Sequence, residues 1–240
     1  LIDPELSLIA KEKEKLEAVG CTPVVPSYDL CEKCLDKYKM FELLQGLKNT
    51  WGDGTDEKLF RAARCYRSVD EFQMASASIN INKISTDEEL NTLFDIYDGL
   101  MIQEFMKGQE YGADVYIDMI SGKCTAIFLK KKIKMRAGET DKSVSVKDEA
   151  LFKRIAKFVE KCGFRGMIDI DLFKDGDDWY LSEVNPRFGG GYPHAYACGV
   201  NMPRYVINNL KGIENSVSIG NYEEGIYMMK YNEVKIRKID

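Results

Sequence analysis

The sequence predicts an α+β protein in which helices pack on an antiparallel sheet, and three observations support this. Apolar and polar residues alternate in several stretches between residues 100 and 184, which is the period of strands buried on one face. Short turns at Lys107-Gly108, Ser121-Gly122 and Asp175-Gly176 join these stretches, so adjacent strands are expected to run antiparallel. Amphipathic helical patterns precede and interrupt them.

The first hundred residues predict mainly helices. Residues 4–19 have the apolar spacing of an amphipathic helix that ends at Gly20, and residues 22–26 predict a short strand. A second helix is expected over residues 30–47, then a loop over 49–55 and helical pieces within 56–75. Alternation over 78–84 predicts a strand, and a capped helix is expected over 85–99.

The remainder of the chain is more regular. Strands are expected over residues 100–104, 110–119 and 124–132, which together form an antiparallel meander. A helix over 148–162, with Leu151, Ile155 and Phe158 on one face, ends at Gly163. Strands over 166–174 and 178–184 form a hairpin, followed by a glycine-rich loop at 189–191, a helix near 203–210 and one or two strands between 226 and 236.

Composition narrows the class of function. The 240 residues carry 34 Lys and Arg against 39 Asp and Glu, a net charge of −5, and no basic stretch is interleaved with aromatic residues, so nucleic acid is not expected as a partner. No apolar run approaches the roughly 20 residues that span a bilayer, and no signal segment opens the chain, so we expect a cytoplasmic protein without membrane contact. The first helix and strand lack the partners of a parallel sheet, so we expect part of a domain upstream.

Cysteine and histidine chemistry is disfavoured. The seven cysteines are scattered, which indicates reduced thiols, and only Cys31 and Cys34 have a metal-like or redox-like spacing. A zinc site would need further ligands, and His194 is the single histidine. A thiol function for Cys31 and Cys34 stays open, although half-buried helix positions explain the pair better.

The acidic residues of the hairpin carry the clearest chemical signal. Asp169 and Asp171 share one face of the first strand with Phe173, and Leu181, Glu183 and Asn185 are expected to share one face of the second. Pairing would set Asp171 opposite Glu183, although like charges directly opposite one another destabilise a sheet. Two carboxylates and an amide oxygen suit Mg²⁺, and Arg187 would face an anion held by that metal. A solvent-facing hairpin with ordinary surface acids is the alternative.

The stretch EVNPRFGGGYP, with Asp171 twelve residues before Glu183 in GMIDIDLF, resembles the ATP-grasp superfamily, in the branch similar to the large subunit of carbamoyl phosphate synthase. DKYKMFELL resembles the first helix of that fold, IQEFMKGQEYGADVYID its hinge and ribose-binding strand, and KKKIKMRAGETDKSVSV its acceptor-side loop. The resemblance implies three regions: residues 1–29 as the remnant of a preceding α/β domain, 30–99 as an N-terminal lobe, and 100–240 as a C-terminal lobe with the metal site, with the nucleotide between the lobes.

The same resemblance implies an ATP- and Mg²⁺-dependent ligase, with Mn²⁺ as a substitute ion, that joins a small-molecule carboxylate to an amine or ammonia through an acylphosphate. A homodimer is compatible with it. Carried over residue by residue, it assigns the metal to Asp171, Glu183 and Asn185, phosphate or acylphosphate to Arg187, the acceptor side to Arg136 and the 189–191 loop, adenine to the hinge residues Glu104, Phe105 and Met106, ribose to Glu110, and the ATP phosphates to Lys37 and the small residues Ser76 and Ser78.

One position departs from the family pattern. The resemblance leads us to expect a lysine that grips the α- and β-phosphates, and Glu71 stands there instead. Either the nucleotide site is degenerate, or the sequence omits residues in this region; the intact acidic set favours the second explanation. The alternative function is therefore a nucleotide-binding or regulatory module of the same fold without ligase activity.

Overall fold

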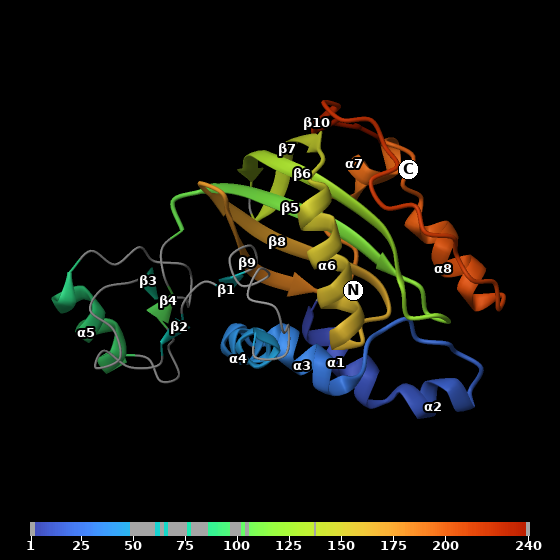
Figure 1. Ribbon diagram of the computed structural model, residues 1–240, viewed down its shortest axis with the longest axis horizontal. Helices are drawn as coiled ribbons and strands as arrows, with labels where there is room; N and C mark the ends of the chain where they lie inside the picture. Colours follow the sequence, from blue (N-terminus) through green and yellow to red (C-terminus); the bar gives the residue numbers. More distant parts are fainter. Residues whose placement is uncertain are drawn as a thin grey trace.

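A computed structural model describes residues 3–48, 61–62, 65–66, 76–77, 86–96, 102–103, 106–136 and 138–238 (Figure 1). Its centre is a seven-stranded sheet in the order β1-β9-β8-β5-β6-β7-β10, antiparallel except for the β1–β9 pair. The strands are β1 (Arg61–Ala62), β5 (Gln109–Ile117), β6 (Cys124–Arg136), β7 (Glu139–Val146), β8 (Gly166–Asp175), β9 (Asp178–Asn185) and β10 (Tyr227–Met229). The predicted hairpin and the predicted α+β class are both confirmed.

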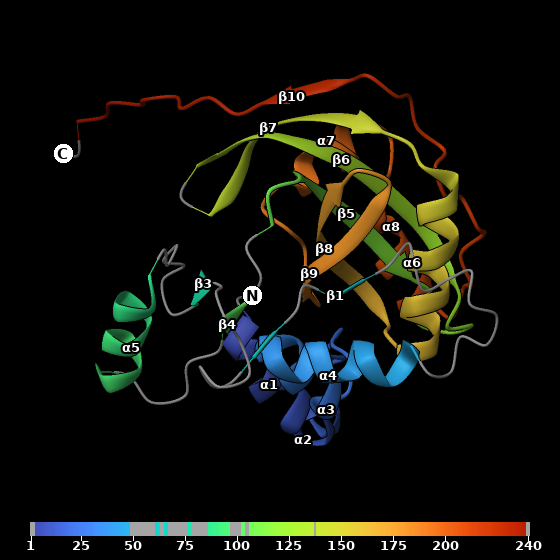
Figure 2. The ribbon, with the colours of Figure 1, turned by 60° about the vertical axis from the view of Figure 1, so that its left-hand side comes forward.

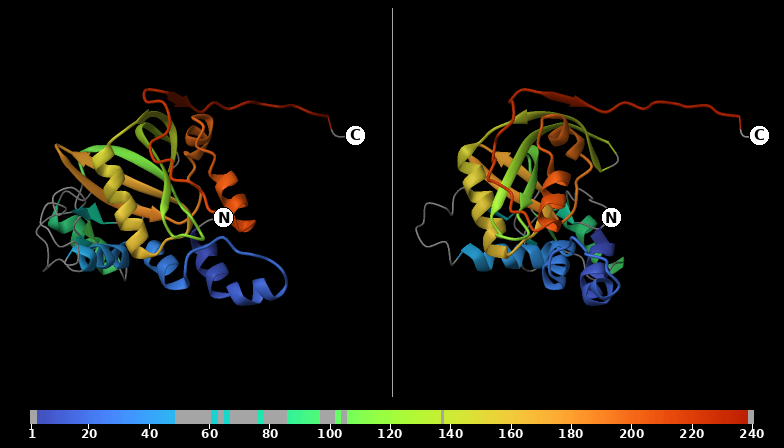
Figure 3. Two further views of the ribbon diagram at one scale, coloured as in Figure 1. Left: turned by 45° about the vertical axis from the view of Figure 1, so that its right-hand side comes forward. Right: turned by 90° about the vertical axis from the view of Figure 1, so that its right-hand side faces the viewer.

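The two faces of this sheet differ in chemistry because the side chains of each strand alternate between them. Ile168, Ile170 and Leu172 of β8 lie on a buried apolar face, whereas Asp169 and Asp171 lie on the other. Helix α6 (Glu149–Cys162) covers the apolar face, and α7 (Tyr192–Ala197) and α8 (Met202–Leu210) lie on the opposite side of the sheet (Figures 1 and 3). The charged face is therefore partly covered and partly open.

Helix α6 forms where the sequence predicts it. The Asp148 side chain caps its first turn by accepting a hydrogen bond from the Leu151 amide at 2.9 Å, and Gly163 ends the helix. Its buried residues include Leu151, Phe152, Ile155, Phe158 and Val159. Asp148 also accepts a hydrogen bond from the Trp179 indole of β9, which ties the start of the helix to the sheet.

Each predicted N-terminal helix is divided in two. The first becomes α1 (Asp3–Lys11) and α2 (Lys13–Ala18), and the second becomes α3 (Tyr28–Leu35) and α4 (Lys37–Lys48). Asp36 separates α3 from α4 because its carboxylate accepts hydrogen bonds from the amides of Tyr38 and Lys39, which starts a new helix. The predicted strand over 22–26 is wrong: this segment has no regular structure, since its two prolines cannot donate to a ladder and no described strand pairs with it, although Val24 lies against Gly166 at the start of β8.

A second, three-stranded sheet has the order β2-β4-β3, with β2 (Cys65–Tyr66), β3 (Ser76–Ala77) and β4 (Ile102–Gln103). The prediction of helix within residues 56–75 is wrong at β1 and β2, where pairing with distant strands overrides the local helical pattern. Strand β4 pairs with β2 and β3, so it does not belong to the predicted meander. Helix α5 (Asp87–Ile96) confirms the predicted helix, whereas the loop over 49–55 and the strand over 78–84 lie outside the described residues.

The C-terminal part confirms α8 and adds elements that the pattern did not indicate. These are β7, whose first residues are polar, and α7, which has only 6 residues, so neither has a clear apolar period in the sequence. Among the described residues of the predicted 226–236 stretch, only β10 is a strand, and beyond it the chain extends along and past the edge of the sheet (Figure 2). Across the residues that the structure describes, no helix has the length and apolar character that crossing a bilayer requires.

Candidate active site

The hairpin of β8 and β9 sets its polar side chains in register. Asp171 pairs with Glu183, as the sequence predicts, and Asp169 pairs with Asn185. The expectation that Leu181 shares their face is wrong. Because Leu172 pairs with Leu181, Ser182 is an extra residue, a bulge, that turns Leu181 into the apolar core, where it is 2% exposed. The bulge lets one strand place Leu181 in the core and Glu183 in the site.

Asp169, Asp171, Glu183 and Asn185 line a cavity of about 400 Å³ over the charged face of the sheet. Strands β6 to β9 supply its floor, the loop after β9 closes one side, and α1 reaches it from outside the sheet. The lining residues are Asp3, Lys132, Met135, Gly138, Glu139, Thr140, Asp169, Asp171, Glu183, Asn185, Arg187, Phe188, Gly189, Gly190 and Gly191. The predicted metal ligands, the predicted phosphate arginine and the glycine loop therefore meet at one place.

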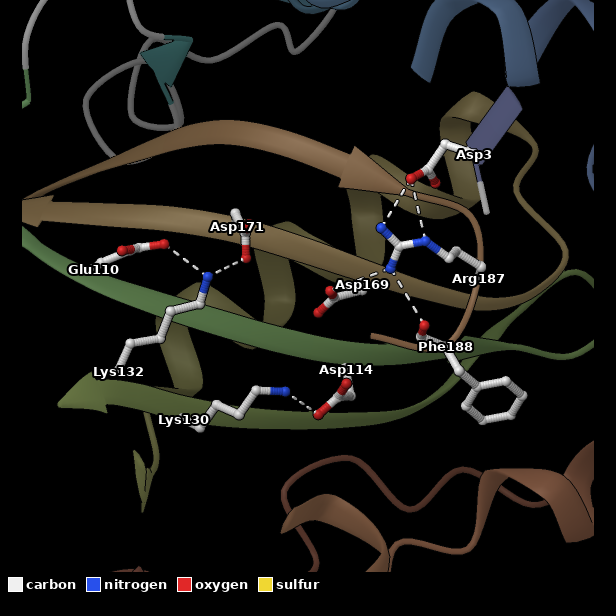
Figure 4. A network of polar contacts seen from close by, with 9 residues as sticks. All are labelled: Asp3, Glu110, Asp114, Lys130, Lys132, Asp169, Asp171, Arg187 and Phe188. Atoms are coloured by element: carbon white, nitrogen blue, oxygen red, sulfur yellow. Dashed lines mark hydrogen bonds and ion pairs between the residues drawn. The ribbon is translucent and has the colours of Figure 1, made fainter. Parts of the chain in front are cut away.

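Lys132 of β6 lies beside the predicted metal ligands. Its Nζ donates to Oδ1 of Asp171 at 2.6 Å and to Oε1 of Glu110 at 2.7 Å, and its side chain is 4% exposed (Figure 4). Burial disfavours the ammonium, but the two carboxylates outweigh burial, Asp171 first, and the pKa of Lys132 is raised. The charged form of Lys132 is thus favoured between Glu110 and Asp171.

A second lysine lies deeper on the same face. Lys130 donates to Oδ2 of Asp114, and both side chains are buried (Figure 4). Asp169 lies opposite Asp114 in the neighbouring strand. Burial raises the pKa of Asp169 to about 7, and the charge of Lys130 only partly opposes this rise. The floor of the cavity therefore contains a carboxyl group that ionises less readily than an exposed one.

Arg187 follows β9 and is held by the N-terminal helix. Its Nη2 and Nε donate to Oδ2 of Asp3 at 2.9 Å and 3.2 Å, and its Nη1 donates to the Phe188 carbonyl at 3.3 Å (Figure 4). The carboxylate of Asp169 lies 4.0 Å from Nη1. The guanidinium is therefore fixed at the rim of the cavity between two carboxylates, in the fork geometry that suits phosphate or carboxylate binding.

The glycine loop lies directly on the charged floor. A Cβ at Gly189 would lie 2.3 Å from Oδ2 of Asp169, and one at Gly191 would lie 2.8 Å from Cε of Lys130. A Cβ at Gly190 would lie 2.9 Å from the carboxyl carbon of Glu139. Only residues without side chains allow the backbone to approach these charges so closely, and backbone amides at such a position can contact an anion.

The donor set fits a hard divalent cation. Asp171, Glu183 and Asn185 all line the cavity and supply two carboxylates and one amide oxygen. Among the residues that the structure describes, no group of three or more His, Cys, Asp or Glu side chains is arranged to hold a metal alone. Mg²⁺ does not need such a group, because it binds through one or two carboxylates and completes its shell with water and substrate phosphates.

The residues expected to bind nucleotide are only partly brought to this cavity. Nζ of Lys37, at the start of α4, lies 3.6 Å from Oε2 of Glu183. Glu110 does not line the cavity itself but accepts a hydrogen bond from Lys132, which does. Arg136 is exposed at the end of β6 and does not line the cavity. Met106 directly precedes the turn into β5, and Ser76 lies in β3. Glu71, Ser78, Glu104 and Phe105 lie outside the described residues.

Asp3, Asp114, Lys130 and Lys132 are charged residues of the site to which the sequence analysis assigned no role. The lysines had a usable signal, since Lys130 and Lys132 alternate within a strand and so share one face. Asp114 in the middle of β5 had the same signal. Asp3 had none, because its partner Arg187 is 184 positions away in the sequence.

The thiol pair does not have the environment of a reactive site. Cys31 and Cys34 are buried on α3. Burial raises the pKa of Cys31 to about 11 and raises the pKa of Cys34 as well, so both stay protonated near neutral pH. This favours the interpretation of the two cysteines as buried helix positions.

Comparison with known proteins gives a family match over more than half of the chain. The model of the family described as "ATP-grasp in the biosynthetic pathway with Ter operon" matches residues 97–234, which include β5 to β10 and every lining residue of the cavity except Asp3. No curated protein matches the sequence.

Solved structures share the fold at low sequence identity. An L-amino acid ligase from Bacillus licheniformis is 18% identical over 90% of this chain and 56% of its own, with a TM-score of 0.60. The biotin carboxylase domain of the Hydrogenobacter thermophilus 2-oxoglutarate carboxylase, a dimer in complex with MgADP, ADP and bicarbonate, is 13% identical over 92% of this chain and 55% of its own, with a TM-score of 0.68. N5-carboxyaminoimidazole ribonucleotide synthetase from Thermus thermophilus is 14% identical over 87% and 61%, with a TM-score of 0.63. The chain thus spans little more than half the length of these proteins.

Proposed function

Because the chain belongs to the ATP-grasp family found in the biosynthetic pathway with the Ter operon, we propose that it is an ATP- and Mg²⁺-dependent ligase that joins a carboxylate to an amine or ammonia. Phosphoryl transfer from ATP would convert the carboxylate to an acylphosphate and release ADP. The nitrogen nucleophile would then attack the acyl carbon, phosphate would leave, and the nucleophile would lose a proton.

One observation carries the proposal: Asp171 and Glu183 face each other in register, with Asn185 on the same strand as Glu183 and Arg187 on the rim of the same cavity. Opposed carboxylates are unfavourable in a sheet that has no cation to hold between them. Each of the two carboxylates has a lysine partner, Lys132 for Asp171 and Lys37 for Glu183. These pairs indicate that positive charge is favourable beside both carboxylates.

Each group would have a separate task. Asp171, Glu183 and Asn185 would hold Mg²⁺, which supplies positive charge to the phosphates when bound. Arg187 would bind the phosphate or acylphosphate through its guanidinium fork. The amides of the 189–191 loop would orient the anionic carboxylate substrate, and the covered part of the charged face would limit the access of water to the acylphosphate. Positioning and charge are what this reaction needs from a protein.

The fold shared with an L-amino acid ligase and with a ribonucleotide synthetase supports small-molecule substrates. We propose a carboxylate as the phosphoryl acceptor, since Arg187 offers a fork for an anion, and an amine as the nucleophile, since the lining of the cavity is rich in acids. A cytoplasmic location and a homodimer remain part of the proposal.

Calorimetric titration with ATP, with and without MgCl₂, tests the binding step. We expect ATP to bind at least about 10-fold more tightly with the metal than without it, and we expect ADP release when a panel of carboxylates is combined with amines. Asp171→Asn should abolish both, whereas Lys134→Met, at an exposed position two residues beyond Lys132, should change neither. Absence of any Mg²⁺-dependent ATP binding by the unaltered chain would overturn the proposal.

The degenerate nucleotide module is the competing function, and Glu71 is the residue that favours it. It predicts weak nucleotide binding that Glu71→Lys strengthens. The ligase proposal predicts tight MgATP binding before any substitution, so the same titration separates the two.

A further inference from the structure

Each charged group that the proposed ligase needs already has an internal partner of opposite charge. Asp171 is paired with Lys132, Glu183 with Lys37, and Arg187 with Asp3. The acids that would hold a cation are thus held by lysines, and the arginine that would hold an anion is held by a carboxylate. A ligand that takes over one of these groups competes with its internal partner.

The contact between Lys132 and Asp171 passes over a glycine in the strand that lies between their two strands. Lys132 belongs to β6 and Asp171 to β8, and β5 runs between them. Gly112 of β5 pairs with Asp171 on one side, and a Cβ at Gly112 would lie 3.1 Å and 3.2 Å from Cε of Lys130 and Lys132. A side chain at Gly112 would narrow this path, and both lysine side chains would have to shift by a few tenths of an ångström. Three neighbouring strands therefore combine to bring a buried ammonium onto the Asp171 carboxylate.

At Arg187 the charges are reversed: the group that would bind the ligand is a cation, and its internal partner is the carboxylate of Asp3. One oxygen of Asp3 accepts two hydrogen bonds from the guanidinium, while its second oxygen, Oδ1, is buried without a hydrogen-bond partner among the described residues. A buried carboxylate oxygen without a partner is unfavourable. Asp3 therefore depends strongly on Arg187, and any anion that takes Arg187 alone leaves the Asp3 carboxylate without compensation.

We propose that Lys132 and Asp3 are placeholders for the two ligands of the site: Lys132 for the metal ion at Asp171, and Asp3 for the anionic group at Arg187. This inference rests on the proposed function. A metal alone would leave Lys132 buried without one carboxylate, and an anion alone would meet Asp171 and Glu183 and displace Asp3. A metal–nucleotide complex supplies both charges at once. Its cation can replace the Lys132 ammonium at Asp171, and its phosphates can accept hydrogen bonds from the displaced ammonium.

The consequence is coupling between the two ligands. Each ligand should bind weakly alone and at least about 10-fold more tightly in the presence of the other, which is within the usual range for coupled sites. Removing a placeholder should strengthen the binding of the ligand that it imitates and reduce the coupling. A purely structural role for either pair would weaken folding without strengthening any ligand.

Mn²⁺ and ADP serve as the probes, with Mn²⁺ binding measured by electron paramagnetic resonance and ADP binding by calorimetry. We expect Lys132→Met to bind Mn²⁺ alone about 10-fold more tightly than the unaltered chain, and Asp3→Asn to bind ADP alone about 10-fold more tightly. The matched controls are Lys134→Met, on the same strand and exposed, and Glu14→Gln, an exposed acid of α2; neither should change.

The two variants keep the inference testable if one fails to fold, since Asp3 lies on a helix outside the sheet and is 28% exposed. Unchanged affinity for Mn²⁺ in Lys132→Met, or for ADP in Asp3→Asn, overturns the placeholder role of that residue while tight binding of Mn²⁺ and ADP together still supports the proposed function. Failure of the unaltered chain to bind the two ligands together overturns both.

Discussion

Gly189 lies so close to Asp169 that a Cβ on the glycine would be 2.3 Å from the carboxylate oxygen Oδ2. The loop that follows β9 and the acid in the middle of β8 thus touch through the backbone. This contact brings the 189–191 amides down onto the charged face of the sheet, where Arg187 and the predicted metal ligands also lie.

Gly189→Ala should therefore destabilise the protein. Asp169 is short and packed within the floor, so it cannot move far, and overpacking of this kind costs about 1–3 kcal/mol. Gly46→Ala is the matched control: it lies in α4 with nothing within 4 Å of its Cβ, and it should stabilise the protein by about 0.5–1 kcal/mol. Urea denaturation of both variants measures the difference, and equal stability of Gly189→Ala and the unaltered chain would contradict the contact.

Glu183→Gln should separate binding from stability. The substitution removes one of two opposed carboxylates, so the free energy of unfolding should stay level or rise slightly, although the Lys37 pair is lost as well. Metal-dependent ATP affinity should fall by about 100-fold or more, since even indirect partners of a metal are worth about 10–100-fold. Thermal melts and calorimetry on one preparation report the two effects. A variant that loses stability but keeps its affinity would refute the assignment of Glu183.

His194 should make stability depend on pH. It is 1% exposed; since the Ile226 carbonyl can only accept, Nε2 donates to it at 3.1 Å, and Nδ1 accepts from the Ser143 hydroxyl at 2.8 Å. Burial, with a smaller contribution from Lys130, lowers the pKa of His194 from 6.5 to about 4.

A lowered pKa means that the unfolded chain binds the proton first. The contribution of neutral His194 is therefore complete above about pH 6.5 and is lost as the pH falls toward 4, by about 3 kcal/mol in total. The unfolding free energy of the unaltered chain minus that of His194→Gln should decrease by this amount across the interval. A difference that does not change with pH would show that the histidine is not held neutral.

Thiol labelling should distinguish Cys21 from the pair on α3. Cys21 is exposed, whereas Cys31 and Cys34 are buried and have raised pKa values. Mass spectrometry after a short treatment with iodoacetamide at about pH 8 should find Cys21 modified well before Cys31 or Cys34. Rapid modification of Cys31 or Cys34 in the folded protein would revive a thiol function, and the same reagent in urea provides the control for intrinsic reactivity.

Local patterns predicted much of the fold and part of the site. Alternation in β8 placed Asp169 and Asp171 on one face, and the turn at 175–177 set the register that brings Asp171 opposite Glu183. The amphipathic spacing of α6 and its capping residue Asp148 defined that helix. These features depend on neighbours in the sequence, so the sequence alone determines them.

Other features depend on which distant segments meet. The Ser182 bulge that separates Leu181 from Glu183 follows from pairing with β8, and residues 61–62 and 65–66 form strands because partners lie beside them.

The charges that complete the site were decided in the same way. Lys132 reaches Asp171 over Gly112, which has no side chain to crowd it in the strand between them, and Asp3 meets Arg187 across nearly the whole chain. The sequence by itself therefore determined the acidic set and the family, through residue types at fixed spacing. The tertiary structure alone decided which internal charges hold those groups, because an ion pair depends on distance in space and burial, and neither follows from position in the chain.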